Sequence, residues 1–199
     1  PNDDSVPNDL DHPDTREALS ALFGERLRGG IVMHGGFFLG PRAFYQRLRE
    51  LDDSARASIN MTRVNLINDL YGGEDLRVLQ RRDARFVNTA FTATLLGAAV
   101  SDQLEDGRVL SGVGGQYNFV SQAHELPGAR SILMTRAWRE RGGEAASNVL
   151  FSYAHNTIPR HLRDMVITEY GVADLRAQTD NEVGMGMLNV ADRRIQVEP

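Results

Sequence analysis

Residues 109–119 constrain the fold of this 199-residue chain more than any other stretch, and they read V-L-S-G-V-G-G-Q-Y-N-F. The apolar pair at their start, Val109 and Leu110, predicts the end of a buried strand. Three glycines follow within four positions, at Gly112, Gly114 and Gly115. Apolar residues then recur at helical spacing, namely Phe119, Val120, Ala123 and Leu126. The stretch therefore predicts a strand, a glycine-rich loop and an amphipathic helix in succession.

A glycine-rich loop at the start of a helix offers backbone N–H groups to a ligand at the positive end of the helix dipole. Glycines also let a ligand approach the backbone without meeting a Cβ atom. This arrangement favours a pocket for a phosphate, a thioester oxygen or another oxyanion, and an ordinary strand-to-helix turn is the alternative. The spacing matches neither the dinucleotide motif G-x-G-x-x-G nor the phosphate loop G-x-x-x-x-G-K-[ST], and the chain contains no lysine.

The composition excludes several classes of protein. With 41% hydrophobic and 25% charged residues, the chain is typical of a globular protein with a core. A net charge of -5 argues against a general nucleic-acid binder, which is usually basic. The absence of cysteine excludes disulfides, thiolate nucleophiles and cysteine-ligated metals. No apolar run approaches the roughly 18 residues of a membrane span, and no secretory signal is visible, so we expect a cytoplasmic protein without membrane partners.

Three segments are expected along the chain. Residues 1–13 are rich in Pro, Asn and Asp and predict a flexible lead-in or linker. In residues 14–180, strands alternate with helices and glycine turns, which is typical of a layered α/β/α domain around a largely parallel sheet. Residues 181–199 form a thinly apolar tail without an assigned element. Because the chain begins at Pro1 without an initiator Met, we expect a piece of a longer protein.

Apolar patterning predicts the elements of this domain. A helix is expected from Asp14 to Gly29, followed by a buried strand over residues 31–38 and a further helix near Pro41. His34, within that strand, is expected to be a hydrogen-bonded core residue, and a functional role is the alternative. Further strands are predicted over residues 57–64, 85–96, 98–100, 131–135, 149–153 and 165–168. Residues 138–143 are polar and contain glycine, and they predict a loop.

Two polar residues within or beside these strands are candidates for a site. Asn88 interrupts the apolar stretch F-V-N-T-A, where a buried amide must find hydrogen-bond partners. Asn88 either satisfies neighbouring backbone groups or faces a ligand. Glu169 follows the strand predicted over residues 165–168, and the C-terminal ends of strands are where α/β sheets bind their ligands.

Four stretches, in matching order, resemble the family of acetyl-CoA hydrolases and class I CoA-transferases. S-G-V-G-G-Q-Y-N-F at 111–119 resembles the family segment G-V-G-G-Q-x-D-F. T-I-P-R-H-L-R-D-M-V-I-T-E-Y-G-V-A-D-L-R at 157–176 is similar to T-x-P-R-x-D-V-D-Y-V-V-T-E-Y-G-x-A-x-L-R. F-V-N-T-A at 86–90 is similar to an I-N-S strand, and F-F-L-G at 37–40 to an F-x-x-G before a helix. The match covers roughly residues 30–180 and corresponds to the C-terminal domain of the family.

The resemblance implies acyl transfer on coenzyme A thioesters, in which a glutamate attacks the acyl-CoA carbonyl. Transferases then pass CoA to a second carboxylate, whereas hydrolases let water finish the reaction. At matched positions it implies that Gly112, Gly114, Gly115 and Gln116 line the CoA-thioester site and that Asn88 points its amide at the thioester or at the nucleophile. Glycine-loop N–H groups are suitable donors to the oxyanion of the tetrahedral intermediate.

The resemblance also implies which molecules the chain meets. CoA and acyl-CoA enter as substrates, together with carboxylates, and no tightly bound cofactor or metal is implied. The N-terminal half of the same protein is an expected partner, because family members bind substrate between two halves. A second copy, forming a homodimer, is an open alternative.

The chain departs from the family pattern in ways that bear on catalysis. The nucleophilic glutamate of the family belongs to an upstream G-x-x-x-E segment, which nothing in residues 1–30 matches; Glu17 and Glu25 lie on what reads as a surface helix. We therefore expect no catalytic nucleophile in this chain and no activity from the chain alone. Asn118 replaces a family aspartate, and R-E-R-G-G-E-A-A-S-N replaces a family loop that contains lysine and arginine.

Several alternatives stay open. Glu169 is the in-chain competitor as nucleophile, or else a structural carboxylate paired with Arg160 or Arg176. The chain is otherwise a non-catalytic CoA-binding or regulatory module, or a nucleotide-binding domain without thioester chemistry. A metal-dependent hydrolase would need three histidines, His124, His155 and His161, whose spacing fits no standard zinc pattern.

Overall fold

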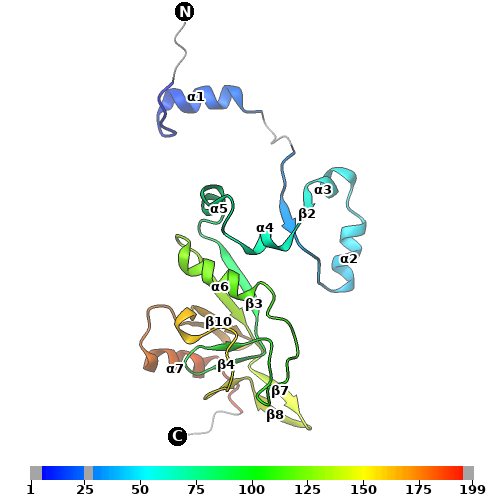
Figure 1. The fold of residues 1–199 in the computed structure, drawn as a ribbon, viewed down its shortest axis with the longest axis vertical. Helices are drawn as coiled ribbons and strands as arrows, with labels where there is room; N and C mark the ends of the chain where they lie inside the picture. Colours follow the sequence, from blue (N-terminus) through cyan, green and yellow to red (C-terminus); the bar gives the residue numbers. More distant parts are fainter. Residues whose placement is uncertain (1–5, 25–28, 195–199) are drawn as a thin grey trace, which may run out of the picture. The chain divides into compact units, whose positions relative to one another are not determined.

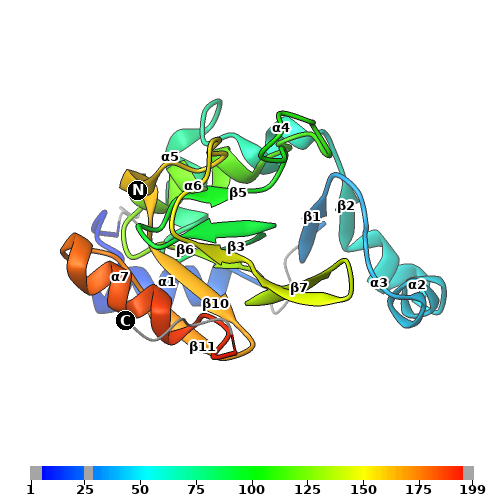
Figure 2. The same cartoon turned by 90° about the horizontal axis from the view of Figure 1, so that it is seen from below.

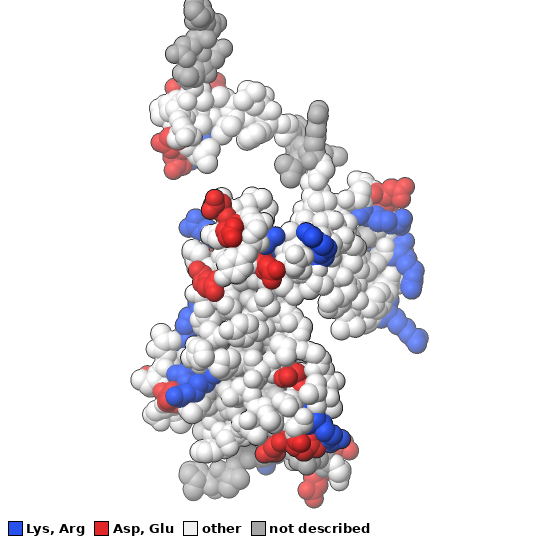
Figure 3. All heavy atoms as spheres, viewed as in Figure 1, with Lys and Arg blue, Asp and Glu red and all other residues white. Residues whose placement is uncertain are grey.

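The chain forms two compact units, Pro1–Ile67 and Asn68–Pro199, in a computed structural model that describes residues 6–24 and 29–194 (Figure 1). Glu25 and the last five residues of the expected tail lie outside the described residues. None of the described helices is long and apolar enough to cross a membrane. In the face shown in Figure 3, basic side chains gather over α2 (Arg42–Arg49), whereas both charges are interspersed over the second unit.

The first unit holds short helices and one pair of strands. Besides α2 its elements are α1 (Pro13–Leu22), β1 (Met33–Gly35), α3 (Asp53–Ala57), β2 (Ile59–Met61) and α4 (Val64–Asn68), which carries the chain into the second unit. β1 and β2 pair in parallel. The expected helix near Pro41 is confirmed, with Pro41 as its N-cap residue.

Burial in this unit was predicted wrongly. The strand expected over residues 31–38 spans only three residues, and Val32 and Phe37 beside it are 80% and 73% exposed. His34 is exposed rather than in a core, and its ring hydrogen-bonds the Asn60 amide at 2.9 Å. An apolar run identifies a strand, but burial needs a second layer, which a lone two-stranded pair lacks. Helix α1 also ends at Leu22, before the expected stop at Gly29.

The second unit contains most of the sheet structure. Its strands are β3 (Arg85–Thr89), β4 (Thr92–Thr94), β5 (Ala99–Val100), β6 (Arg130–Met134), β7 (Trp138–Arg141), β8 (Glu144–Ser147), β9 (Val149–Leu150), β10 (Met165–Thr168) and β11 (Gly171–Asp174). Its helices are α5 (Glu74–Gln80), α6 (Gln116–Glu125), the 3₁₀ turn η1 (Arg160–Leu162) and α7 (Asp180–Asn189).

A four-stranded sheet in the order β11–β10–β6–β3 forms the centre of this unit (Figure 2). Strands β3 and β10 each pair in parallel with β6, and β11 pairs antiparallel with β10. A smaller sheet, β5–β4–β9, also combines one parallel and one antiparallel pair. The α/β class expected for a layered domain around a largely parallel sheet is confirmed, in sheets that combine parallel and antiparallel pairs.

Helices α6 and α7 pack against the same face of the central sheet. Phe86 on β3 stacks on Phe119 of α6, with ring centroids 5.7 Å apart. Thr168 on β10 donates a 2.7 Å hydrogen bond to the carbonyl of Val190, at the end of α7. The core between sheet and helices includes Val120, Leu133, Val166, Val183 and Met187.

A buried carboxylate joins distant parts of this unit. Asp164, whose side chain is 0% exposed, lies 2.7 Å from the guanidinium of Arg130 and 2.5 Å from that of Arg176. It also accepts a 2.6 Å hydrogen bond from the backbone N–H of Ser131. Burial of a charge is tolerated only with such pairing.

Helix α7 gives the first part of the expected tail a defined element. It begins with a capping box between Thr179 and Glu182, and Val183 and Met187 on it are fully buried. The sequence hid this helix because its two glycines, Gly184 and Gly186, lower helix propensity. The limits predicted for lead-in, domain and tail stay predictions.

Candidate functional site

The glycine stretch precedes a helix as expected, but not a strand. Val109 and Leu110 are 69% and 57% exposed, so the buried strand predicted there is wrong. Val109 instead forms an isolated bridge with Gln103. Helix α6 is confirmed and begins at Gln116, and no side chain caps its N-terminus. No side chain of a capping residue therefore competes with a ligand for the first backbone N–H groups of this helix.

The three glycines have different surroundings. A Cβ atom on Gly112 or Gly114 would meet nothing within 4 Å, so the backbone there is open to approach. Gly114 also has φ +61°, a conformation that favours glycine. A Cβ on Gly115 would lie 2.4 Å from the side chain of Asn68, so this position is closely packed.

The two predicted amide residues, Asn88 and Gln116, come together where β3 ends and α6 begins. Gln116 is 7% exposed, and its Nε2 donates a 3.1 Å hydrogen bond to the carbonyl of Thr89, the residue after Asn88. Gln116 Oε1 and Asn88 Nδ2 are both buried, and neither has a hydrogen-bond partner among the described residues. Buried polar atoms without partners are uncommon, and they mark this junction as a place for a ligand.

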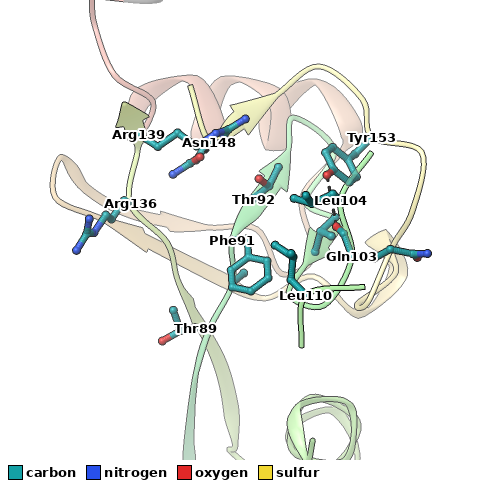
Figure 4. A pocket seen from close by; sticks show the side chains of 12 residues that line it. Thr89, Phe91, Thr92, Gln103, Leu104, Leu110, Arg136, Arg139, Asn148 and Tyr153 are labelled. Carbon is teal, nitrogen blue, oxygen red and sulfur yellow. Dashed lines mark hydrogen bonds between the residues drawn. The ribbon is translucent and has the colours of Figure 1, made fainter. Parts of the chain in front are cut away.

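A cavity of about 400 Å³ begins beside this junction (Figure 4). Thr89 borders it, and its walls include four apolar side chains, those of Phe91, Val100, Leu104 and Leu110. The hydroxyl of Tyr153 donates a hydrogen bond to the carbonyl of Gln103 on the same wall. The cavity therefore offers a largely apolar space that reaches Thr89, the residue whose carbonyl accepts the hydrogen bond from Gln116.

Two arginines that sequence reasoning missed, Arg136 and Arg139, also line the cavity. Arg139 lies on β7, which forms an antiparallel hairpin with β8, so the loop predicted over residues 138–143 is wrong. The pair Gly142-Gly143, with φ +64° and +86°, forms the tip. A Gly-Gly pair between two short segments is a recognised hairpin signal, and it would have found this element.

Glu169 has a different partner from those expected. Its Oε2 accepts a 2.8 Å hydrogen bond from the backbone N–H of Ala137. Arg160 instead pairs with Asp180 at 2.8 Å, and Arg176 pairs with Asp164. The prediction of an Arg160 or Arg176 partner for Glu169 is therefore wrong, while a structural role fits its backbone contact.

The histidines proposed for a metal site do not form one in the described part of the chain. There, no group of three or more His, Cys, Asp or Glu residues could hold a metal ion. The ring of His124 contacts the carbonyl of Leu162 at 3.1 Å instead.

Comparison with known proteins points to one group of enzymes. The chain is 27% identical over 122 residues to 4-hydroxybutyrate coenzyme A transferase of Clostridium kluyveri, covering 61% of this chain and 28% of that protein. It is 24% identical over 159 residues to butyryl-CoA:acetate CoA-transferase of Anaerostipes caccae, covering 78% of this chain and 33% of that protein. The chain thus spans about a third of the length of these relatives.

Solved structures agree with this comparison. The crystal structure of RipA from Yersinia pestis matches with a TM-score of 0.63 and 25% identity, over 81% of this chain and 34% of RipA. A family profile described as the acetyl-CoA hydrolase/transferase C-terminal domain matches residues 40–198. Since that range is most of the chain, the chain belongs to the acetyl-CoA hydrolase/transferase family and corresponds to its C-terminal domain.

Proposed function

We propose that this chain binds the thioester end of an acyl-CoA and supplies hydrogen-bond donors to the oxyanion formed during acyl transfer. The observation that carries the proposal is the buried, unpartnered donor Asn88 Nδ2 beside the uncapped start of α6, where Gln116 holds the carbonyl of Thr89 through its Nε2. The open backbone at Gly112 and Gly114 adds N–H donors at the same place. An amide and backbone N–H groups fixed in advance stabilise developing negative charge without reorganisation.

The chemistry follows from a carboxylate nucleophile. Its oxygen bonds to the thioester carbonyl carbon, and the carbonyl oxygen becomes an oxyanion that accepts hydrogen bonds from Asn88 and the glycine loop. When the oxyanion collapses, the C–S bond breaks, CoA leaves as a thiolate and a mixed anhydride remains. The thiolate then attacks the glutamyl carbonyl of the anhydride, the carboxylate product leaves, and CoA is held as a glutamyl thioester. A second carboxylate then takes CoA from this glutamyl thioester, or water hydrolyses the thioester and releases free CoA.

The nucleophile in this proposal is a glutamate from the N-terminal half of the protein. Glu169 is a poor candidate because one of its oxygens is held by the Ala137 N–H. The relatives named as CoA-transferases support acyl-CoA and carboxylate substrates for the whole protein. A homodimer and a cytoplasmic location remain part of the proposal.

Binding of acetyl-CoA, measured by isothermal titration calorimetry, tests the proposal. We expect the 199-residue chain to bind acetyl-CoA, and Asn88→Ala and Gln116→Ala to weaken binding. Asn118→Ala is a matched control, because this amide is exposed on the same helix and its 3.5 Å contact is with Asp69. Equal affinity of all four proteins would overturn the assignment of the site.

Trapping of the covalent intermediate separates the enzyme from a non-catalytic CoA-binding module, the second candidate function. The protein with its N-terminal half is incubated with acetyl-CoA and treated with borohydride, which reduces a glutamyl thioester. A reduced glutamate mapped to the N-terminal half supports the enzyme. A reduced Glu169 would place the nucleophile in this chain, and binding without any reduced residue favours the binding module.

A further inference from the structure

A cavity of about 450 Å³ lies at the other end of the central sheet from the proposed thioester site. Its walls come from the end of α6, the 3₁₀ turn η1 before β10, and the segment between β11 and α7. Thr89 and Gln116 instead lie where β3 ends and α6 begins, beside Met134 at the end of β6. The five residues of β6 separate the two ends of the sheet by roughly 15 Å. This cavity is therefore a separate place for a ligand.

Positive charge dominates the walls of this cavity. Three arginines line it, Arg160, Arg163 and Arg176, against one carboxylate, that of Asp180. The exposed ring of His161 lines it as well, and no hydrogen bond or ion pair of the described residues involves this ring. Guanidinium groups gathered around one space are typical of sites for phosphate, whose oxygens accept their N–H donors in pairs.

Asp180 holds two of these arginines in place. Its Oδ2 accepts a hydrogen bond of 2.8 Å from Nη1 of Arg160, and its Oδ1 accepts one of 2.8 Å from Nη1 of Arg163. Arg163 also donates to the carbonyls of Leu96 and Gln178, at 3.2 and 3.0 Å. Because two guanidinium groups share one carboxylate, a net positive charge remains between them. Both side chains are also oriented before a ligand arrives, which lowers the cost of binding.

The arginines keep hydrogen-bond donors that the fold does not use. Arg160 carries five N–H groups, and only its Nη1 takes part in the hydrogen bonds of the described residues. The two Nη atoms of Arg176 bind the carbonyls of Ala129 and Ala123 and the carboxylate of Asp164, but its buried Nε has no partner among the described residues. A buried donor without a partner is uncommon, and it adds to the unused donor capacity beside the cavity.

We propose that this cavity binds a phosphate group, held between Arg160, Arg163 and His161. The arginines donate the N–H groups that Asp180 leaves unused, and the ring of His161 donates one further hydrogen bond. Donors on different side chains around one space suit the several acceptor oxygens of a phosphate better than the two oxygens of a planar carboxylate. The phosphate is either free or the end of a small molecule, since both present the same oxygens. The site is independent of the proposed function, because none of its residues takes part in thioester binding.

Phosphorus NMR of inorganic phosphate, titrated with the 199-residue chain at constant ionic strength, tests the proposal. We expect saturable broadening of the phosphate signal. Arg160→Gln should weaken binding about tenfold or more, because a hydrogen bond to a charged group is lost. Arg160 is exposed and pairs with Asp180, so this variant should keep the fold, which circular dichroism checks. His161→Ala, at an exposed ring without contacts, should weaken phosphate binding to a smaller extent.

Arg108→Gln is the matched control. Arg108 is also an exposed arginine that pairs with one exposed carboxylate, that of Asp106 at 2.8 Å, and it lies outside this cavity. The variant removes the same charge and should leave phosphate binding unchanged. Equal weakening by Arg108→Gln and Arg160→Gln would show that phosphate responds only to overall charge, and it would overturn the proposal. The absence of saturable binding to the wild-type chain would overturn it as well.

Two further arms identify the ligand and the place where it binds. Adenosine monophosphate that binds more tightly than inorganic phosphate, and is lost in Arg160→Gln, identifies the phosphate end of a small molecule. Equal or weaker binding of adenosine monophosphate identifies free phosphate. Saturating acetyl-CoA should leave phosphate binding unchanged, because the two sites lie at opposite ends of the sheet. Displacement of phosphate by acetyl-CoA would place the phosphate in the CoA site and overturn the separate site.

Discussion

Gln116, in the first turn of α6, donates a hydrogen bond of 3.1 Å to the carbonyl of Thr89 at the end of β3. The same amide leaves its oxygen without a partner among the described residues, as does the nitrogen of Asn88. One of these side chains thus holds the junction together, and the other contributes no hydrogen bond from its buried nitrogen. Stability and ligand affinity should therefore respond differently to the two residues.

Replacing Asn88 by Ala should not lower stability, because it removes a buried donor that has no partner. Replacing Gln116 by Ala should lower the free energy of unfolding by about 1 kcal/mol through loss of the Thr89 hydrogen bond. Urea denaturation of both variants and of the wild type measures the difference. A large loss of stability in Asn88→Ala would mean that its amide has a structural role instead of facing a ligand.

The glycines allow a second contrast within one motif. Gly115→Ala should lower the melting temperature, because its Cβ would lie 2.4 Å from the Asn68 side chain. Gly112→Ala should leave the melting temperature unchanged and weaken acetyl-CoA binding, since only a ligand would meet its Cβ. Combining Gly115→Ala with Asn68→Ala should restore stability. If both glycine variants unfold alike, the difference in packing is not what distinguishes these positions.

Asp164 should be the most sensitive acidic residue of the second unit. Asp164→Ala leaves Arg130 and Arg176 without their buried anion, and it should cost about 3–5 kcal/mol of unfolding free energy. Asp164→Asn should be milder, because the amide oxygen still accepts from the Ser131 N–H. Asp106→Ala, which breaks an exposed pair, serves as the control and should leave the denaturation midpoint unchanged.

Acid should weaken the C-terminal part of the second unit through Asp192. Hydrogen bonds from the Arg194 guanidinium and backbone lower the pKa of this carboxyl to about 2. Because the pKa of Asp192 in the folded state lies below its usual value near 4, the ionised carboxyl stabilises the folded state fully above about pH 4. That stabilisation is lost as the pH falls through about 2. Melting temperatures between pH 5 and pH 2 should fall less steeply in Asp192→Asn than in the wild type. The exposed Asp75→Asn is the control, and an unchanged slope in Asp192→Asn would contradict the prediction.

Sequence patterning predicted the central elements of the second unit. It failed where the structure depends on which apolar residues are buried. Strands β3, β6 and β10 and helix α6 were expected, because each has a continuous apolar or helical pattern. Val109 and Leu110 were expected to be buried, but both are exposed, and Leu110 lies in the wall of the cavity. Composition alone does not distinguish these two environments.

The site was predicted in part. The stretch around Gln116 and the interrupting Asn88 were found from the sequence, and their roles as ligand contacts stay predictions. Arg139 was missed because the strand that carries it, W-R-E-R, has three charged residues after its tryptophan and no apolar alternation. Arg139 lines the cavity from β7, which pairs with β8 across Gly142-Gly143, and the polar composition of the hairpin masked this local turn signal.

The Asp164 cluster has a consequence for the way the unit assembles during synthesis. Its two arginines are separated from each other by most of the unit's sheet-forming segments, and the carboxylate is buried only when both are in place. A nascent chain that has not yet reached Arg176 therefore cannot bury Asp164 at low cost, and its β6–β10 pairing stays weak. The second unit should fold late and all at once, after its last strand has left the ribosome, rather than strand by strand.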